Sequence, residues 1–193
     1  KGPVHINAPF EEPLYETVEE LSVEPKITHL EDILTTKIIE NSDEFVSTWN
    51  SAKRKLVVVG VNETNVIDQE TIEKLAQDPS VVVLTETTSN LHDPSFINSI
   101  DTLITPFDDD DFQELEPEIL ITFGGMIVSK RIKGFLRKYK PKQHWHIDTL
   151  RAYDTFGALT NHFVMQPNDF FKDLFSKVKP IKSDYFEKIN AVY

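Results

Sequence analysis

One segment of the chain, Phe123–Arg131, has the residue types and spacing of an anion-binding site. Gly124-Gly125 follows a run of apolar residues, so the backbone can turn tightly from the end of a strand into a helix. The first turn of a helix presents free N–H groups and a partial positive charge. Ser129, Lys130 and Arg131 fall in those first turns, and Arg can hold a carboxylate through two parallel hydrogen bonds. The segment therefore predicts an anion site at a strand end, where open α/β sheets bind ligands.

A basic, solvent-exposed helix face is the alternative interpretation of the same segment. Seven of the 13 residues that follow Ser129 are basic: Lys130, Arg131, Lys133, Arg137, Lys138, Lys140 and Lys142. Runs of charge usually mark a solvated surface, so composition alone leaves both interpretations open. The segment is neither a dinucleotide fingerprint nor a P-loop, because Gly-x-Gly-x-x-Gly and Gly-Lys-Ser/Thr do not occur in the sequence.

Three other groups of polar residues could carry chemistry. His144 and His146 would share one face of a strand and could bind a metal with Asp148, although no further ligand is indicated. The acidic run Asp108–Asp111 could attract Ca²⁺, but it lacks the pattern of an EF-hand, and a solvated loop is the favoured interpretation. The polar segment Thr85–Asn90 fits a site-lining loop or a helix-capping loop, and the sequence favours the second.

Composition excludes several classes of function. The chain has 193 residues, no cysteine, and a net charge of −12. A field of that sign repels phosphate backbones and anionic lipids, so we expect no nucleic-acid or membrane partner. The apolar runs are far shorter than the roughly 20 residues that cross a bilayer. The absence of cysteine excludes disulfides and thiolate sites and fits a reducing compartment, so we expect a cytoplasmic protein.

The positioning elements follow from the spacing of apolar residues. Short apolar runs typical of strands buried on both faces alternate with helical patterns. The predicted strands are 55–61, 80–85, 118–123, 145–148 and 159–165. The predicted helices are 43–51, 68–77, a stripe from Phe96 to Ile104, a segment from Val128 to Tyr139, and one that opens at Pro167. This alternation predicts an α/β fold, an open and mainly parallel Rossmann-like sheet with helices on both faces.

The same patterns divide the chain into three parts. Val4, Ile6 and Phe10 look like a buried strand and its exit, and Pro and Glu crowd the residues that follow. We therefore expect 1–51 to be the end of a preceding domain plus a linker. The Rossmann-like domain occupies 52–178, and 179–193 is a linker toward a missing domain. On this interpretation the chain is an excised piece of a longer protein.

Two parts of the sequence together resemble a known enzyme family. Gly2–Tyr15, which ends in Phe-Glu-Glu-Pro-Leu-Tyr, resembles the end of the first domain of thiamine-diphosphate enzymes. That extension points within them to the 2-succinyl-5-enolpyruvyl-6-hydroxy-3-cyclohexene-1-carboxylate synthases of menaquinone biosynthesis. The Gly124-Gly125 pair, Ser129–Arg131 and His144–Asp148 look like the central domain of these synthases.

The resemblance implies a function for the whole enzyme rather than for this chain. Such synthases are transferases that decarboxylate 2-oxoglutarate on thiamine diphosphate, with Mg²⁺, and add the succinyl semialdehyde unit to isochorismate. The catalytic Glu and the Gly-Asp-Gly metal motif of the family lie in the other two domains, so no catalytic, cofactor or metal residue is assigned here. Lys130 and Arg131 match the basic pair that contacts substrate carboxylates, and Ser129 matches as a motif position. The chain alone should be inactive, and the full-length enzyme a homodimer or homotetramer.

Two alternatives remain beside the synthase interpretation. One is the central domain of another thiamine-diphosphate enzyme, such as a relative of acetolactate synthase that binds a flavin there. The other is a non-enzymatic module that binds an acidic metabolite through the basic face of Lys130–Lys142.

Overall fold

The computed structural model describes residues 5–9, 17, 19–20, 24 and 42–193. Residues 5–9 and 42–193 fall into two separate units. Residues 5–9 contain no strand, and the side chain of Ile6, which was predicted to be buried against a preceding domain, is exposed in this chain. Val4 and Phe10, the other members of that predicted strand, lie outside the described residues.

Residues 42–193 fold around one five-stranded sheet in which every strand is parallel to its neighbours. The strand order is β2-β1-β3-β4-β5. The strands are β1 (Lys55–Val59), β2 (Val81–Leu84), β3 (Ile119–Phe123), β4 (Gln143–Ile147) and β5 (Asn161–Phe163). All five predicted strands are confirmed; four are shorter than predicted, and β4 begins two residues earlier, at Gln143, and ends at Ile147. The structure confirms the predicted open, parallel α/β sheet.

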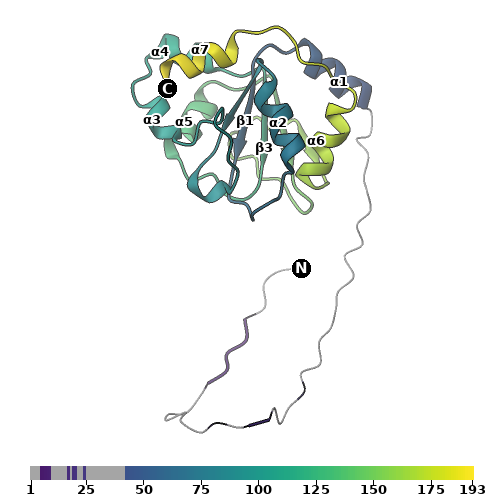
Figure 1. Ribbon diagram of the computed structural model, residues 1–193. Coiled ribbons are helices and arrows are strands. Elements are labelled where there is room, and N and C mark those ends of the chain that lie inside the picture. Colours follow the sequence, from purple (N-terminus) through teal and green to yellow (C-terminus); the bar gives the residue numbers. More distant parts are fainter. Residues whose placement is uncertain (1–4, 10–16, 18, 21–23, 25–41) are drawn as a thin grey trace. The chain divides into compact units, whose positions relative to one another are not determined.

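Helices cover both faces of the sheet, because alternate strand residues point to opposite sides. One face packs against α1 (Ser42–Ser51), α2 (Gln69–Gln77) and α6 (Pro167–Phe175). The other packs against α3 (Ile100–Ile104), α4 (Asp109–Leu115), α5 (Lys130–Lys138) and α7 (Tyr185–Val192). Figure 1 shows the sheet between these two groups. A short 3₁₀ turn, η1 (Thr87–Ser89), follows β2. None of the helices in the described ranges is long and apolar enough to cross a membrane.

The compact body extends beyond the predicted domain limits at both ends. Trp49 of α1 is fully buried against Trp145 and the aromatic cluster of α6. At the other end, Tyr185 of α7 is buried and donates its hydroxyl to the Leu115 carbonyl at 2.7 Å. Residues 179–193 therefore include a helix of the domain rather than only a linker. The pattern from Tyr185 to Ile189 is a single helical spacing of four residues, too short to stand out in the sequence.

Three smaller predictions are wrong for local reasons. The helix predicted from Phe96 begins only at Ile100, because Ile97 pairs with Leu84 as an isolated parallel bridge. The acidic run predicted as a loop forms the first turn of α4, since Asp108 caps the helix and carboxylates are favourable there. Val128, predicted to be buried, lies before α5 and is exposed.

The loops after β1 and β3 cross in direct backbone contact. Gly60 N–H donates to the Phe123 carbonyl at 2.9 Å, and Gly125 N–H donates to the Val61 carbonyl at 2.7 Å. A Cβ atom on Gly60 would collide with the carbonyl oxygen of Gly125. Gly124 adopts φ +81°, a conformation that L side chains rarely adopt. The two loops can therefore approach this closely only because Gly60 and Gly124 carry no side chain.

A pair of glycine substitutions tests this requirement. We expect Gly60→Ala to destabilise the chain by about 1–3 kcal/mol or more, because the loop backbones must separate. Gly134→Ala is the matched control: Gly134 lies inside α5, and an added Cβ meets no atom within 4 Å. Alanine there should stabilise the chain by about 0.5–1 kcal/mol through helix propensity. Urea unfolding measures both, and equal effects of the two substitutions would contradict the close approach.

Candidate functional site

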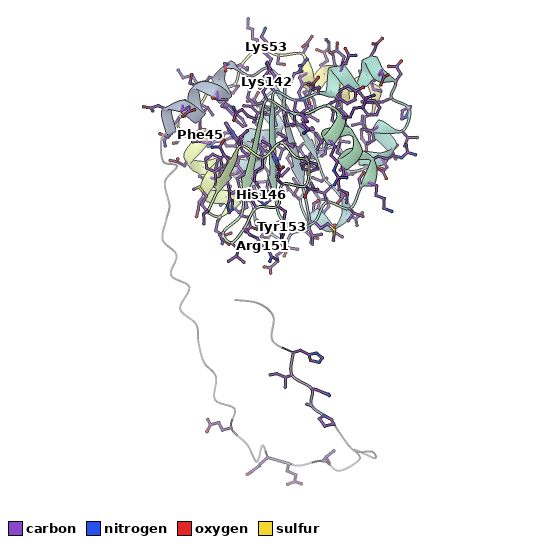
Figure 2. The ribbon with its side chains drawn as sticks, turned by 180° about the vertical axis from the view of Figure 1, so that it is seen from behind. Phe45, Lys53, Lys142, His146, Arg151 and Tyr153 are labelled. Carbon is purple, nitrogen blue, oxygen red and sulfur yellow. The ribbon has the colours of Figure 1, made fainter. Side chains whose placement is uncertain are left out.

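The carboxyl ends of β3 and β4 open into a pocket with a volume of about 780 Å³. This is within the range of small-molecule sites. The pocket lies between the strand ends, α5 and the connection from Asp148 to Phe156. Figure 2 shows His146, Arg151 and Tyr153 at this end of the sheet, with Lys53 and Lys142 at the opposite end. The site thus lies at the edge of the sheet where open α/β folds bind ligands.

The lining combines apolar surface with an excess of positive charge. The apolar part comes from Phe123, Met126, Ile127, Tyr153 and Phe156. Four basic side chains, Lys130, Lys133, Arg137 and Arg151, line the pocket, together with the one carboxylate of Asp148. That carboxylate accepts hydrogen bonds from the backbone N–H groups of Leu150 and Arg151 at 2.6 and 2.9 Å. This environment favours an anion that carries an apolar group.

Helix α5 supplies three of the four basic side chains because of its periodicity. Lys130, Lys133 and Arg137 are spaced i, i+3 and i+7, which places them on one helix face. Lys133 donates to the Ile127 carbonyl at 3.1 Å, and Arg137 donates to the Thr155 carbonyl at 3.0 Å. The ammonium group of Lys130 forms neither a hydrogen bond nor an ion pair with any residue that the structure describes. This group is therefore available to a ligand.

The three predicted site residues occupy different environments. Lys130 lines the pocket, whereas Arg131 is exposed, is not among the lining residues, and has no ion-pair partner in the described ranges. Ser129 is buried: its hydroxyl accepts from the Ile132 N–H at 3.2 Å and donates to Asp101 at 2.5 Å. Ser129 thus caps α5, and its hydroxyl is already engaged within the protein.

The start of α5 is occupied by a carboxylate of the chain itself. Glu86 accepts from the backbone N–H of Val128 at 2.8 Å and from that of Ser129 at 2.7 Å. These amides were predicted to bind a ligand, and here they bind Glu86 instead. The segment Thr85–Asn90 is therefore a capping segment, as the sequence favoured, although it caps a helix that follows the next strand. The amides of Val128 and Ser129 are therefore not available to a ligand, whereas the basic side chains of α5 line the pocket.

Replacement of Glu86 tests this cap. Glu86→Ala leaves two N–H groups without their acceptor and should cost about 1–3 kcal/mol in the free energy of unfolding. Glu86→Gln keeps one oxygen acceptor and should cost less. Chemical denaturation of both variants gives the comparison, and a Glu86→Ala chain as stable as the wild type would show that the cap is dispensable.

The two predicted strand histidines do share one face, but a hydroxyl joins them instead of a metal. Thr122 Oγ1 lies 2.8 Å from Nε2 of His144 and 2.8 Å from Nδ1 of His146. No group of three or more potential metal ligands occurs among the described residues. Burial lowers the pKa of His144 to about 4 and also lowers the pKa of His146. Both imidazoles are therefore neutral at pH 7.

His144 should make stability depend on pH. The unfolded chain binds a proton at this residue below pH 6.5, while the folded chain binds it only near pH 4. The unfolded state thus binds more protons in that window, so stability falls as pH falls, by on the order of 3 kcal/mol. Urea midpoints between pH 7.5 and 4.5 measure the slope. The His144→Phe variant, which cannot titrate, should show a flatter slope, and an unchanged slope would refute the assignment to His144.

Sequence reasoning found part of this site and missed part of it. The i, i+3, i+7 spacing of Lys130, Lys133 and Arg137 was available as a signal for a shared face. Arg151 and Tyr153 carried no such signal, because they lie in a connection without regular structure. The cation of Arg151 lies 5.0 Å from the centroid of the Tyr153 ring. Only the tertiary structure brings this pair to the pocket.

Comparison with known proteins adds two findings. A family model described as "Middle domain of thiamine pyrophosphate" matches residues 25–179. Several curated proteins named 2-succinyl-5-enolpyruvyl-6-hydroxy-3-cyclohexene-1-carboxylate synthase are similar to the chain. The protein from Flavobacterium johnsoniae is 74 % identical over 100 % of this chain and 35 % of its own length. The Flavobacterium psychrophilum protein is 60 % identical over 96 % of the chain and 33 % of its own length. The Porphyromonas gingivalis protein is 34 % identical over 93 % and 31 %. The chain thus spans about a third of the length of these relatives.

Proposed function

The chain belongs to the family of middle domains of thiamine pyrophosphate enzymes, and from this premise we propose that it is the central domain of a 2-succinyl-5-enolpyruvyl-6-hydroxy-3-cyclohexene-1-carboxylate synthase. The identity to relatives of that name supports the proposal. The enzyme is a cytoplasmic transferase of menaquinone biosynthesis, and it assembles as a homodimer or homotetramer. It decarboxylates 2-oxoglutarate and transfers the resulting succinyl semialdehyde unit to isochorismate.

Thiamine diphosphate and Mg²⁺ are the proposed cofactors of the whole enzyme. When bound, thiamine diphosphate supplies the carbanion chemistry of decarboxylation. The described residues contain no group of three or more side chains that could hold a metal ion. We therefore assign no cofactor ligand here, and we propose that the chain alone is inactive. Its own contribution is a scaffold and a set of contacts to substrate carboxylates.

This role is supported by the basic residues at the start of α5, at the edge of the pocket. Both proposed substrates are carboxylates, and Lys130 reaches the pocket without an intramolecular partner in the described ranges. Arg131 is exposed beside it, so its guanidinium is free to reach a carboxylate held by a neighbouring domain. Ser129 acts as a positioning residue, because its side chain fixes the first turn that carries both cations.

The loop crossing disfavours a flavin-binding domain, the first alternative. In sheets of this strand order, a nucleotide binds at the switch point between β1 and β3. Here the backbones of Gly60 and Gly125 meet at that point. A non-enzymatic binding module, the second alternative, would use the same basic residues but would need no other domain.

Substitutions of the basic pair in the full-length synthase test the proposal. A hydrogen bond to a charged group is worth about 1.5–3 kcal/mol. Lys130→Ala and Arg131→Ala should therefore each lower kcat/KM for a substrate by about one to two orders of magnitude. Arg131→Lys should rescue only partly, because the planar fork is lost. Thermal stability should stay nearly unchanged, since both side chains are exposed.

Lys53→Ala is the matched control. It removes one exposed positive charge at the opposite edge of the sheet and should leave the kinetics unchanged (Figure 2). If Arg131→Ala unfolds the protein and the surviving enzyme has normal kinetics, Arg131 is a structural residue. Equal losses in the Lys53 variant would point to a general effect of charge.

A further inference from the structure

The hydroxyl of Thr122 imposes a direction on the hydrogen bonds beneath the pocket. Thr122 and His146 are paired across β3 and β4, and His144 lies two residues earlier on the same face. Thr122 Oγ1 is 2.8 Å from a nitrogen of each ring. A hydroxyl carries one proton, so it can donate to only one of the two rings. Thr122 is buried and its hydroxyl has no other partner among the described residues, so its proton goes to one of the two rings. The other ring then donates its own N–H to the hydroxyl oxygen.

The unpartnered nitrogen of His144 decides between the two directions. Its Nδ1 is fully buried and has no hydrogen-bond partner among the described residues. If Thr122 donated to Nε2 of His144, the ring proton would lie on Nδ1, as a buried donor without an acceptor. Buried N–H groups without a partner are rarer than unfilled acceptors. His144 therefore donates from Nε2 to Thr122, and Thr122 donates to Nδ1 of His146.

This direction places the remaining proton of His146 on its outer nitrogen. With Nδ1 accepting from Thr122, the neutral ring carries its proton on Nε2. That nitrogen has no acceptor within the described ranges, and unlike Nδ1 of His144 it is not completely buried. His146 lines the pocket together with Lys130, Lys133, Arg137 and Arg151. The pocket thus contains a neutral, oriented donor among four cations.

We propose that His146 donates its Nε2–H to a carboxylate oxygen of a ligand whose apolar body packs in this pocket, and that Thr122 is the positioning residue that fixes the donor. The apolar lining, with the aromatic rings of Phe123, Tyr153 and Phe156, favours a ring-bearing carboxylate. The inference rests on the proposed function only insofar as Lys130 makes the pocket an anion site. The Nε2–H of His146 is a neutral donor with a fixed direction, so it sets the orientation of the ligand. A flexible ammonium group cannot do this.

Nitrogen NMR of the 193-residue chain, labelled at histidine and titrated with benzoate, tests the inference. At pH 7.5 we expect the His146 ring to be protonated at Nε2 before any ligand is added. Benzoate should shift that Nε2 signal, whereas benzyl alcohol, which has the same ring without the charge, should not. A ring protonated at Nδ1 in the free chain would overturn the inference.

Three variants separate positioning from binding. His146→Phe should weaken benzoate binding by about tenfold, as expected for one hydrogen bond to a charged group. Thr122→Val should lose the preference for the Nε2 tautomer and bind benzoate less tightly, by a smaller factor. Thr122→Ser keeps the hydroxyl and should restore both the tautomer and the affinity. If Thr122→Val folds poorly, the serine variant and His146→Phe still decide the outcome.

Lys130→Ala separates the failure of this inference from the failure of the proposed function. If benzoate binding depends on Lys130 but not on His146, the anion site stands and the role of His146 is wrong. If the wild-type chain binds benzoate no better than benzyl alcohol, the pocket is not an anion site in this chain. That result overturns both the inference and the proposed role of Lys130 in the pocket.

Discussion

The close backbone contact between the loops at the ends of β1 and β3 shapes the end of the sheet where the candidate site lies. Gly60 and Gly125 bring the two backbones into hydrogen-bonding contact, and no side chain fits between them. In a sheet with the order β2-β1-β3-β4-β5, that point is where a nucleotide commonly binds. The pocket of the candidate site lies one strand further along, between β3, β4 and α5, and a smaller pocket lined by Val61, Asn62, Gly124 and Gly125 lies beside the loop contact.

The chemistry of the pocket follows from which groups the protein satisfies internally. Glu86 engages the amides of Val128 and Ser129 just before α5, and Ser129 caps the helix through the Ile132 amide. The same helix then projects Lys130 into the pocket without an intramolecular partner in the described ranges. Beneath it, Thr122 and the two strand histidines form a neutral hydrogen-bonded floor. Fixed positive charge above a neutral donor is an arrangement that favours an anion with a defined orientation.

The chain matches one domain of its named relatives rather than their whole length, so its own contribution is that of a domain. The family describes a middle domain, and the chain spans about a third of the relatives named as synthases. A middle domain of such an enzyme need not contain the cofactor ligands, and the described residues contain no metal-binding cluster. On the proposed function, its role is to position the cations carried by the first turn of α5, which Ser129 holds in place.

The sequence by itself determined the α/β class and the parallel strands, because continuous apolar runs that alternate with helical stripes fit few other folds. It also located the Gly124-Gly125 turn and the basic helix, since both signals are contiguous in the chain. It did not identify α7, whose apolar pattern is only one turn long, or the cap from Glu86, which lies 42 residues before Val128. Arg151 and the hydrogen bonds of Thr122 were also decided by tertiary structure. Their partners are neighbours only across strands or loops, and local spacing carries no record of such contacts.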